Sequence, residues 1–136
     1  MAYWLIKSEP DVWSWADQVK NEVTSWDGVR NYQARNNLRV MKVGDLALFY
    51  HSGNERRIMG IVTVIKPYYP DPSDPSGRFG MVDVKVLESL PHPVSLAHIK
   101  SDPRLQNIGL VKQSRLSVMP IDGASWEILG QAGKRE

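Results

Sequence analysis

The chain has 136 residues, of which 42% are hydrophobic and 24% are charged, and its formal net charge is +2. This length suits a single domain, residues 1–136, with no apolar run long enough to span a membrane, and the absence of cysteine excludes disulfides, thiol catalysis and cysteine metal sites. So small a net charge does not indicate nucleic-acid binding by itself, and such a function has to rest on local clusters of charge.

The chain begins with an expected strand and a short helix. Residues 2–8 have the apolar pattern of a partly buried strand, which ends before Pro10. Ser14 is placed as the N-cap of a helix, and Asp17 three residues later occupies the second position of a capping box.

A strand, a helix and a second strand are expected next. Residues 22–26 have strand character, and Gly28 breaks the chain after them. Residues 30–39 are expected to be helical, although their asparagines lower the helix propensity. A turn at residues 44–45 leads into a strand over residues 46–50.

The middle of the chain predicts two strands joined by a proline-rich loop. Residues 57–66 are rich in β-branched side chains, and residues 81–86 alternate between apolar and polar. Residues 67–78 hold four of the nine prolines and are expected to be a loop, long enough to suggest a function. Within it, Asp71 and Asp74 are interpreted as solvated turn residues rather than as a catalytic pair.

The C-terminal third predicts short helical turns, one strand and a closing helix. The turns are expected at residues 95–100 and 102–107, the strand at 114–121, the helix at 122–131 and a tail at 133–136. Strands in this chain do not alternate regularly with long helices, which argues against a doubly wound parallel sheet. The pattern favours a mixed α/β (α+β) fold, in which a small β-barrel of five to six strands is surrounded by short helices.

The sequence gives no support for catalysis or for a metal site. The three histidines, His51, His92 and His98, lack the spacing of metal ligands. There is no P-loop, no nucleophile elbow and no dinucleotide-binding glycine motif. We therefore expect no cofactor and no metal.

The five tryptophans are expected to lie mostly in the core. Of Trp13 and Trp15, which flank a helix cap, one is expected to pack inward. Trp26 differs, because it ends a strand, precedes an Asp-Gly turn and opens a basic segment. We expect its ring to be exposed at the rim of the barrel.

The basic segment, residues 28–44, contains four cations and no acidic residue. Aromatic residues flank it, with Trp26 before it and Tyr50 after it. An ordinary solvated helix face is the alternative interpretation. Basic charge interleaved with aromatic rings is nevertheless typical of proteins that bind unpaired or flipped bases, since the rings stack on bases and arginines hold phosphates.

Three motifs resemble the EVE domain family of the PUA-like superfamily. They are "YWLIKSEP", "WDGVRNYQARN" and "GDLALFYHS", and the likeness continues through "VDVKV", "LSVMPI" and "SWEIL" over nearly the whole chain. The resemblance implies a PUA-like fold related to the YTH and ASCH domains. It also implies recognition of modified bases, notably modified cytosine in DNA, with modified RNA as an open alternative.

The resemblance further implies one pocket built from these motifs. Trp26 and Tyr50 would stack on the base, while Glu9 would accept a hydrogen bond from an exocyclic amine. Phe79 stands where the family often has tryptophan. The expected base pocket comprises Ser8, Glu9, Trp26, Asn31, Tyr32, Tyr50, His51, Ser52 and Phe79. The expected phosphate contacts are Lys7, Arg30, Arg35 and Arg39, with an ion pair to Glu9 or another acid as the alternative role of Lys7.

We therefore predict a non-catalytic reader of a modified base, with DNA or RNA as its partner. Two alternatives stay open: an enzyme that uses Glu9 or His51 as acid and base, and a module that binds a small ligand in the same pocket. We expect a monomer. The first ten residues lack the features of a secretion signal, so a cytoplasmic location is expected, or a nuclear one in a eukaryote.

Overall fold

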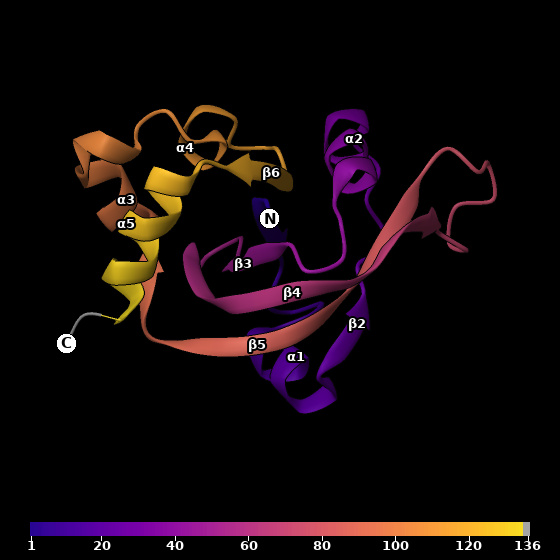
Figure 1. Ribbon diagram of the computed structural model, residues 1–136, viewed down its shortest axis with the longest axis horizontal. Helices are drawn as coiled ribbons and strands as arrows, with labels where there is room; N and C mark the ends of the chain where they lie inside the picture. Colours follow the sequence, from indigo (N-terminus) through magenta and orange to yellow (C-terminus); the bar gives the residue numbers. More distant parts are fainter. Residues whose placement is uncertain (135–136) are drawn as a thin grey trace.

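The computed structural model describes residues 1–134, in which six strands form one mixed sheet. Their order across the sheet is β2-β5-β4-β3-β1-β6 (Figure 1). The pair β1 and β3 is parallel, and the other pairs are antiparallel. The strands are β1 (Tyr3–Ser8), β2 (Val23–Ser25), β3 (Leu46–His51), β4 (Arg57–Pro70), β5 (Gly80–Ser95) and β6 (Val118–Ile121).

The predicted mixed α/β fold is confirmed, with a sheet that curves strongly (Figure 1). The terminal strands of the sheet order, β2 and β6, have no strand pairing with each other within residues 1–134, so hydrogen bonds do not close a barrel there. Strands β4 and β5 bend with the sheet, because their pairing shifts register at several points and such irregularities bend strands.

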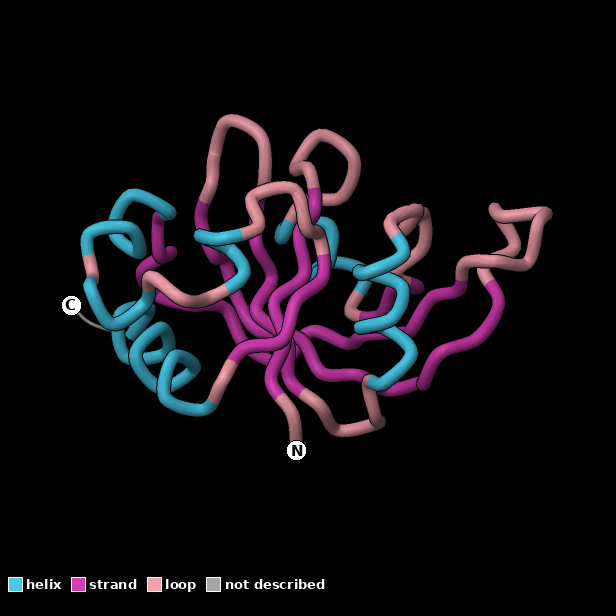
Figure 2. Tube along the Cα trace, turned by 90° about the horizontal axis from the view of Figure 1, so that it is seen from above, coloured by secondary structure: helices cyan, strands magenta, loops and turns pink. Residues whose placement is uncertain are grey.

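Five α-helices and one 3-10 helix cover the sheet at its margins. Figures 1 and 2 show α3, α4 and α5 gathered toward one end, with α2 toward the other. No helix within residues 1–134 has the length and apolar character needed to cross a membrane. The helices are α1 (Trp15–Asn21), α2 (Tyr32–Val40), α3 (Leu96–Ser101), η1 (Pro103–Leu105), α4 (Gly109–Lys112) and α5 (Gly123–Lys134).

The start of α1 follows the predicted capping box. The Ser14 hydroxyl accepts a hydrogen bond from the Asp17 amide at 3.0 Å, and the Asp17 carboxylate accepts one from the Ser14 amide at 3.0 Å. Trp15 then turns into the core, against Phe49, with ring centroids 5.1 Å apart. Its ring needs glycine at position 60, where a β-carbon would lie 2.1 Å from the indole. The inward member of the tryptophan pair is therefore Trp15.

Two expectations on chain boundaries were wrong. The first part of the predicted loop is strand, because β4 continues to Pro70 and pairs with the start of β5, opposite Gly80. Helix α4 was not predicted, since it has only four residues. The predicted tail is helical through Lys134, and its last two residues, 135 and 136, lie outside the described residues.

Candidate functional site

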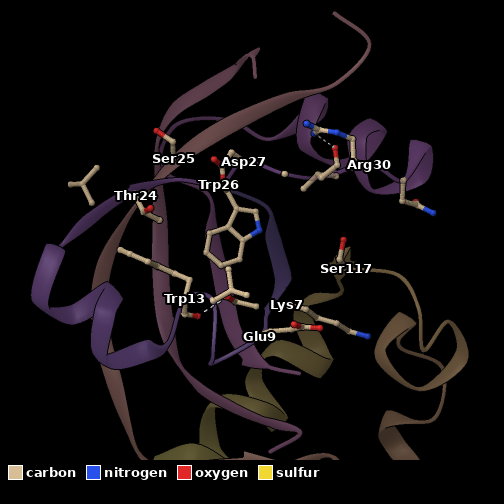
Figure 3. Close-up of a pocket in the computed structure, with 15 residues that line it drawn as sticks. Lys7, Glu9, Trp13, Thr24, Ser25, Trp26, Asp27, Arg30 and Ser117 are labelled. Atoms are coloured by element: carbon tan, nitrogen blue, oxygen red, sulfur yellow. Dashed lines mark hydrogen bonds between the residues drawn. The ribbon is translucent and has the colours of Figure 1, made fainter. Parts of the chain in front are cut away.

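A cavity of about 860 Å³ opens between the end of β1, the segment from β2 to α2, and the chain before β6 (Figure 3). β2 and β6 are the two edge strands of the sheet and β1 lies next to β6, so it is the curvature of the sheet that brings these segments together (Figure 1). Of the predicted site residues, the cavity wall includes Lys7, Ser8, Glu9, Trp26, Arg30 and Asn31.

Trp26 forms a wall of this cavity, but its predicted exposure at the rim was wrong. The residue is only 8% exposed, and its ring meets Phe49 edge-on, with centroids 5.5 Å apart and an angle of 83°. Its amide donates to the Val82 carbonyl at 2.7 Å, which extends the pairing of β2 with β5 and turns the ring inward. The indole N–H donates to no protein group within residues 1–134, so the ring offers the cavity both apolar surface and a hydrogen-bond donor.

Trp13 supplies a second ring to the cavity, and the predicted site did not include it. Its indole N–H donates to the Gln18 side chain at 2.9 Å, and its carbonyl accepts from the Ser8 hydroxyl at 2.6 Å. These bonds fix the ring at the start of α1. The sequence could have indicated this position, because Ser14 caps a helix between Trp13 and Trp15. The chain turns at such a cap, so one ring packs in the core and the other lies outside it.

The polar wall of the cavity holds groups of both charges. Lys7 donates from its ammonium to the Ser114 carbonyl at 2.8 Å, and burial lowers the pKa of this lysine. Glu9 is exposed at the rim, and neither it nor Lys7 forms a salt bridge within residues 1–134. The side-chain carbonyl of Asn31 accepts from the Ala34 amide at 2.9 Å as the N-cap of α2. This bond leaves the NH₂ group of Asn31 for a ligand.

Asp71 holds the rim of the cavity in place, and its interpretation as a solvated turn residue was wrong. It is only 2% exposed. Its carboxylate accepts from the Gly28 amide at 2.8 Å and from the Arg30 guanidinium at 3.3 Å, and it also binds Ser73. Burial acts to raise the pKa of Asp71, but the bonds from Ser73, Gly28 and Arg30 outweigh it and lower the pKa to about 2. The ionised carboxylate therefore ties the 71–79 loop to the segment between β2 and α2.

Three predicted site residues form a separate cluster beside the cavity, which we call the outer stack: Tyr32, Arg35 and Phe79. The two aromatic rings are 5.0 Å apart, and the guanidinium of Arg35 lies 4.9 Å from the Tyr32 ring centroid. Arg35 also donates to the Arg78 carbonyl at 3.1 Å. Arg39 lies farther along α2, over the Tyr68 ring at 5.7 Å. None of these residues lines the cavity.

The three predicted residues at the end of β3 lie behind the cavity wall. Tyr50 is buried, and the Ser52 amide donates to the Ser8 carbonyl at 3.0 Å. His51 accepts from the Trp15 amide at 2.8 Å through Nε2, so its Nδ1 carries the proton and donates to Glu55 at 2.9 Å. None of the three lines the cavity: Ser52 supports β1 through its backbone amide, and His51 supports α1 through its side chain.

Comparison with known proteins connects this architecture to a family. The family description "EVE domain" matches residues 2–132. Human thymocyte nuclear protein 1 is 34% identical over 169 residues, which cover 99% of this chain and 75% of that protein. An NMR structure of a Rhodopseudomonas palustris protein is 45% identical, covers 98% of this chain and 93% of its own, and superposes with a TM-score of 0.92.

Two further solved structures are similar to this chain, one of them at low sequence identity. The human THYN1 protein, in complex with DNA that contains 5-methylcytosine, is 33% identical, with a TM-score of 0.90 and coverage of 100% of this chain and 99% of that chain. The YTH domain of Mmi1 is 13% identical with a TM-score of 0.60, over 96% of this chain and 86% of its own. At that identity the likeness concerns the fold alone, and it agrees with the predicted PUA-like architecture.

Proposed function

The chain belongs to the EVE domain family, and we propose that its cavity binds a modified cytosine of DNA, taken out of the base stack. The observation that carries this proposal is a cavity with two indole walls, Trp13 and Trp26, next to unpaired polar groups. The human THYN1 protein, in complex with DNA that contains 5-methylcytosine, supports the choice of ligand. Modified RNA is the alternative partner.

In the proposed complex the base lies against the indole rings. Extrusion from the stack costs a few kcal/mol, and stacking on an aromatic ring returns about 1–3 kcal/mol per base. Hydrogen bonds must therefore supply part of the affinity. The Glu9 carboxylate accepts from the exocyclic amine of cytosine, and the NH₂ group of Asn31 and the indole N–H of Trp26 donate to the ring acceptors.

The phosphates next to the base contact cations near the cavity. Lys7 and Arg30 line its wall, and Arg35 and Arg39 continue the basic surface along α2. Tyr32 and Phe79 act in this proposal by holding Arg30 and Arg35, whose guanidinium groups lie 5.6 and 6.0 Å from the Phe79 ring. Tyr50, His51 and Ser52 act by supporting the strand and helix that carry the cavity wall.

We propose binding without catalysis. The enzyme hypothesis needs a free acid or base, and both ring nitrogens of His51 are engaged by Trp15 and Glu55. Of the two residues that this hypothesis names, only Glu9 lines the cavity, where Asp27 is a second carboxylate. A selective contact with one methyl group is worth on the order of 1–3 kcal/mol, which is enough for a reader that prefers the methylated base.

The test is a binding comparison of single-stranded DNA and RNA oligonucleotides that carry cytosine or 5-methylcytosine. Wild-type protein is expected to prefer the methylated DNA by about tenfold or more. Glu9→Gln removes a charge-assisted hydrogen bond and is expected to weaken binding by roughly tenfold to a hundredfold. Glu127→Gln, which neutralises an exposed carboxylate on α5, is the matched control. Equal affinity of wild-type protein for the two bases contradicts the proposal.

A further inference from the structure

A second cavity, of about 320 Å³, adjoins the base cavity and shares Asn31 with it. One side is the first turn of α2, which contributes Gln33. The other side is the segment 112–116, which runs from the last residue of α4 toward β6. A ligand that leaves the base cavity past Asn31 therefore enters this second cavity.

The two cavities differ in charge. The base cavity has two cations, but it also has the carboxylates of Glu9 and Asp27. The second cavity has Lys112 and Arg115, and no acidic residue lines it. Both cations are exposed, and neither forms a salt bridge within the part of the chain that the structure describes. The second cavity is thus the more favourable of the two for an anion.

Internal hydrogen bonds hold the two sides of the second cavity at a fixed separation. The Lys7 ammonium donates to the Ser114 carbonyl at 2.8 Å, and the Lys7 amide donates to the Ser117 carbonyl at 2.9 Å. On the α2 side, the Asn37 side chain donates to the Val118 carbonyl at 2.7 Å. The cations are therefore presented on a segment attached to both β1 and α2.

We propose that the second cavity binds the backbone phosphate adjacent to the base in the first cavity, an inference that rests on the proposed function. The guanidinium of Arg115 provides paired N–H donors for phosphate oxygens, and the Lys112 ammonium adds a second positive charge. The side-chain amides of Gln33 and Gln113 provide neutral donors beside them. The strand then passes from base to phosphate across Asn31, the residue that both cavities share.

The test uses the double substitution Lys112→Gln with Arg115→Gln. A single-stranded DNA oligonucleotide that carries 5-methylcytosine should bind about tenfold more weakly, and the slope of log affinity against log salt should shrink by about one to two units. The free nucleoside 5-methyldeoxycytidine, which has no phosphate, should bind with unchanged affinity. Lys100→Gln with Lys134→Gln removes the same charge from α3 and α5, at positions that line neither cavity, and should change neither value.

The position of the contact is tested with a neutral methylphosphonate, introduced on one side of the 5-methylcytosine at a time. One of the two oligonucleotides should bind wild-type protein more weakly and should lose no further affinity with the double variant. If wild-type protein does not distinguish 5-methylcytosine from cytosine, both the proposed function and this inference are overturned. If it does, and the double variant binds as the control does, the phosphate site alone is overturned.

Discussion

The base cavity and the outer stack use consecutive parts of the chain, since residues 26–31 line the cavity and Tyr32 and Arg35 belong to the outer stack. Both regions combine aromatic rings with cations. In the base cavity, the rings of Trp13 and Trp26 border open space. In the outer stack, the rings of Tyr32 and Phe79 lie against each other and against Arg35. The same residue types are therefore available to a ligand in one region and largely occupied by each other in the next.

The difference shows that local composition alone does not reveal which aromatic rings and arginines are free to bind a ligand. An aromatic ring can stack on a base only if one of its faces is free, and an arginine with internal partners has fewer donors left for phosphate. Both conditions depend on long-range packing. Variants that affect one region and leave the other intact can test the distinction, and they are considered from the largest expected effect to the smallest.

The largest effect is expected for Trp26→Ala. Because this ring is 8% exposed and packs on Phe49, its removal should lower the free energy of unfolding by about 3–5 kcal/mol. Tyr32→Ala in the outer stack should lower it by only about 1 kcal/mol, since Tyr32 is 52% exposed. Urea denaturation of both variants measures the difference.

Binding separates the ligand role of Trp26 from its role in the core. Trp26→Phe keeps an aromatic ring but removes the indole N–H, and it should stay folded while binding 5-methylcytosine DNA several-fold more weakly. Tyr32→Ala should bind this DNA nearly as wild-type protein does. The comparison fails if Tyr32→Ala loses more affinity than Trp26→Phe.

A smaller effect on the free energy of unfolding, of about 2 kcal/mol, is expected for replacement of Asp71, the carboxylate that joins the two regions. The folded-state pKa of Asp71 is lowered to about 2, so its contribution to stability is present above the unfolded-state pKa near 4 and is lost as pH falls through about 2. Asp71→Asn should therefore be less stable than wild-type protein at pH 7, and the gap should narrow between pH 4 and pH 2. Glu127→Gln, an exposed change on α5, is the control. A gap for Asp71→Asn that does not change with pH contradicts the assignment.

The sequence predicted the parts of this architecture that depend on neighbouring residues. The cap of α1 is such a part, since Ser14 was expected there from its spacing to Asp17. The cap of α2 was not predicted, because the helix was expected from Arg30 onward and Asn31 was expected only as a site residue. Lys7 and Trp26 were expected at the site from motifs, and both line the cavity.

The sequence could not predict the contacts made across the fold. Asp71 is buried only because the hairpin of β4 and β5 brings its loop against Gly28, 43 residues away. Ser117 reaches the cavity through the pairing of β6 with β1, and Phe79 reaches Tyr32 through the same hairpin of β4 and β5. Each of these contacts depends on strand register, which composition and local periodicity do not specify.

Asn31→Asp tests the two roles of Asn31 separately, its cap of α2 and its proposed contact with the ligand. The expected effect on the free energy of unfolding is about 0.5 kcal/mol or less. Aspartate caps a helix about as well as asparagine, so the free energy of unfolding should change little. The substitution replaces the NH₂ donor with an anionic acceptor at the junction of the two cavities. Affinity for 5-methylcytosine DNA should fall by roughly tenfold, and Asn54→Asp, an exposed change in the turn between β3 and β4, is the control.

The smallest effect on affinity is expected for Arg35→Gln in the outer stack. Its cation–π contacts are partly exposed and should contribute about 0.5–1 kcal/mol to stability. As a proposed phosphate contact, Arg35 should also reduce the salt slope by about one unit when it is replaced, with a loss of affinity of about threefold. Since Arg35 already binds the Arg78 carbonyl and two rings, this loss should be smaller than that of the variant that lacks Lys112 and Arg115. A larger loss for Arg35→Gln would mean that the outer stack opens to meet the strand, and the contrast between the two regions would then hold only for the free protein.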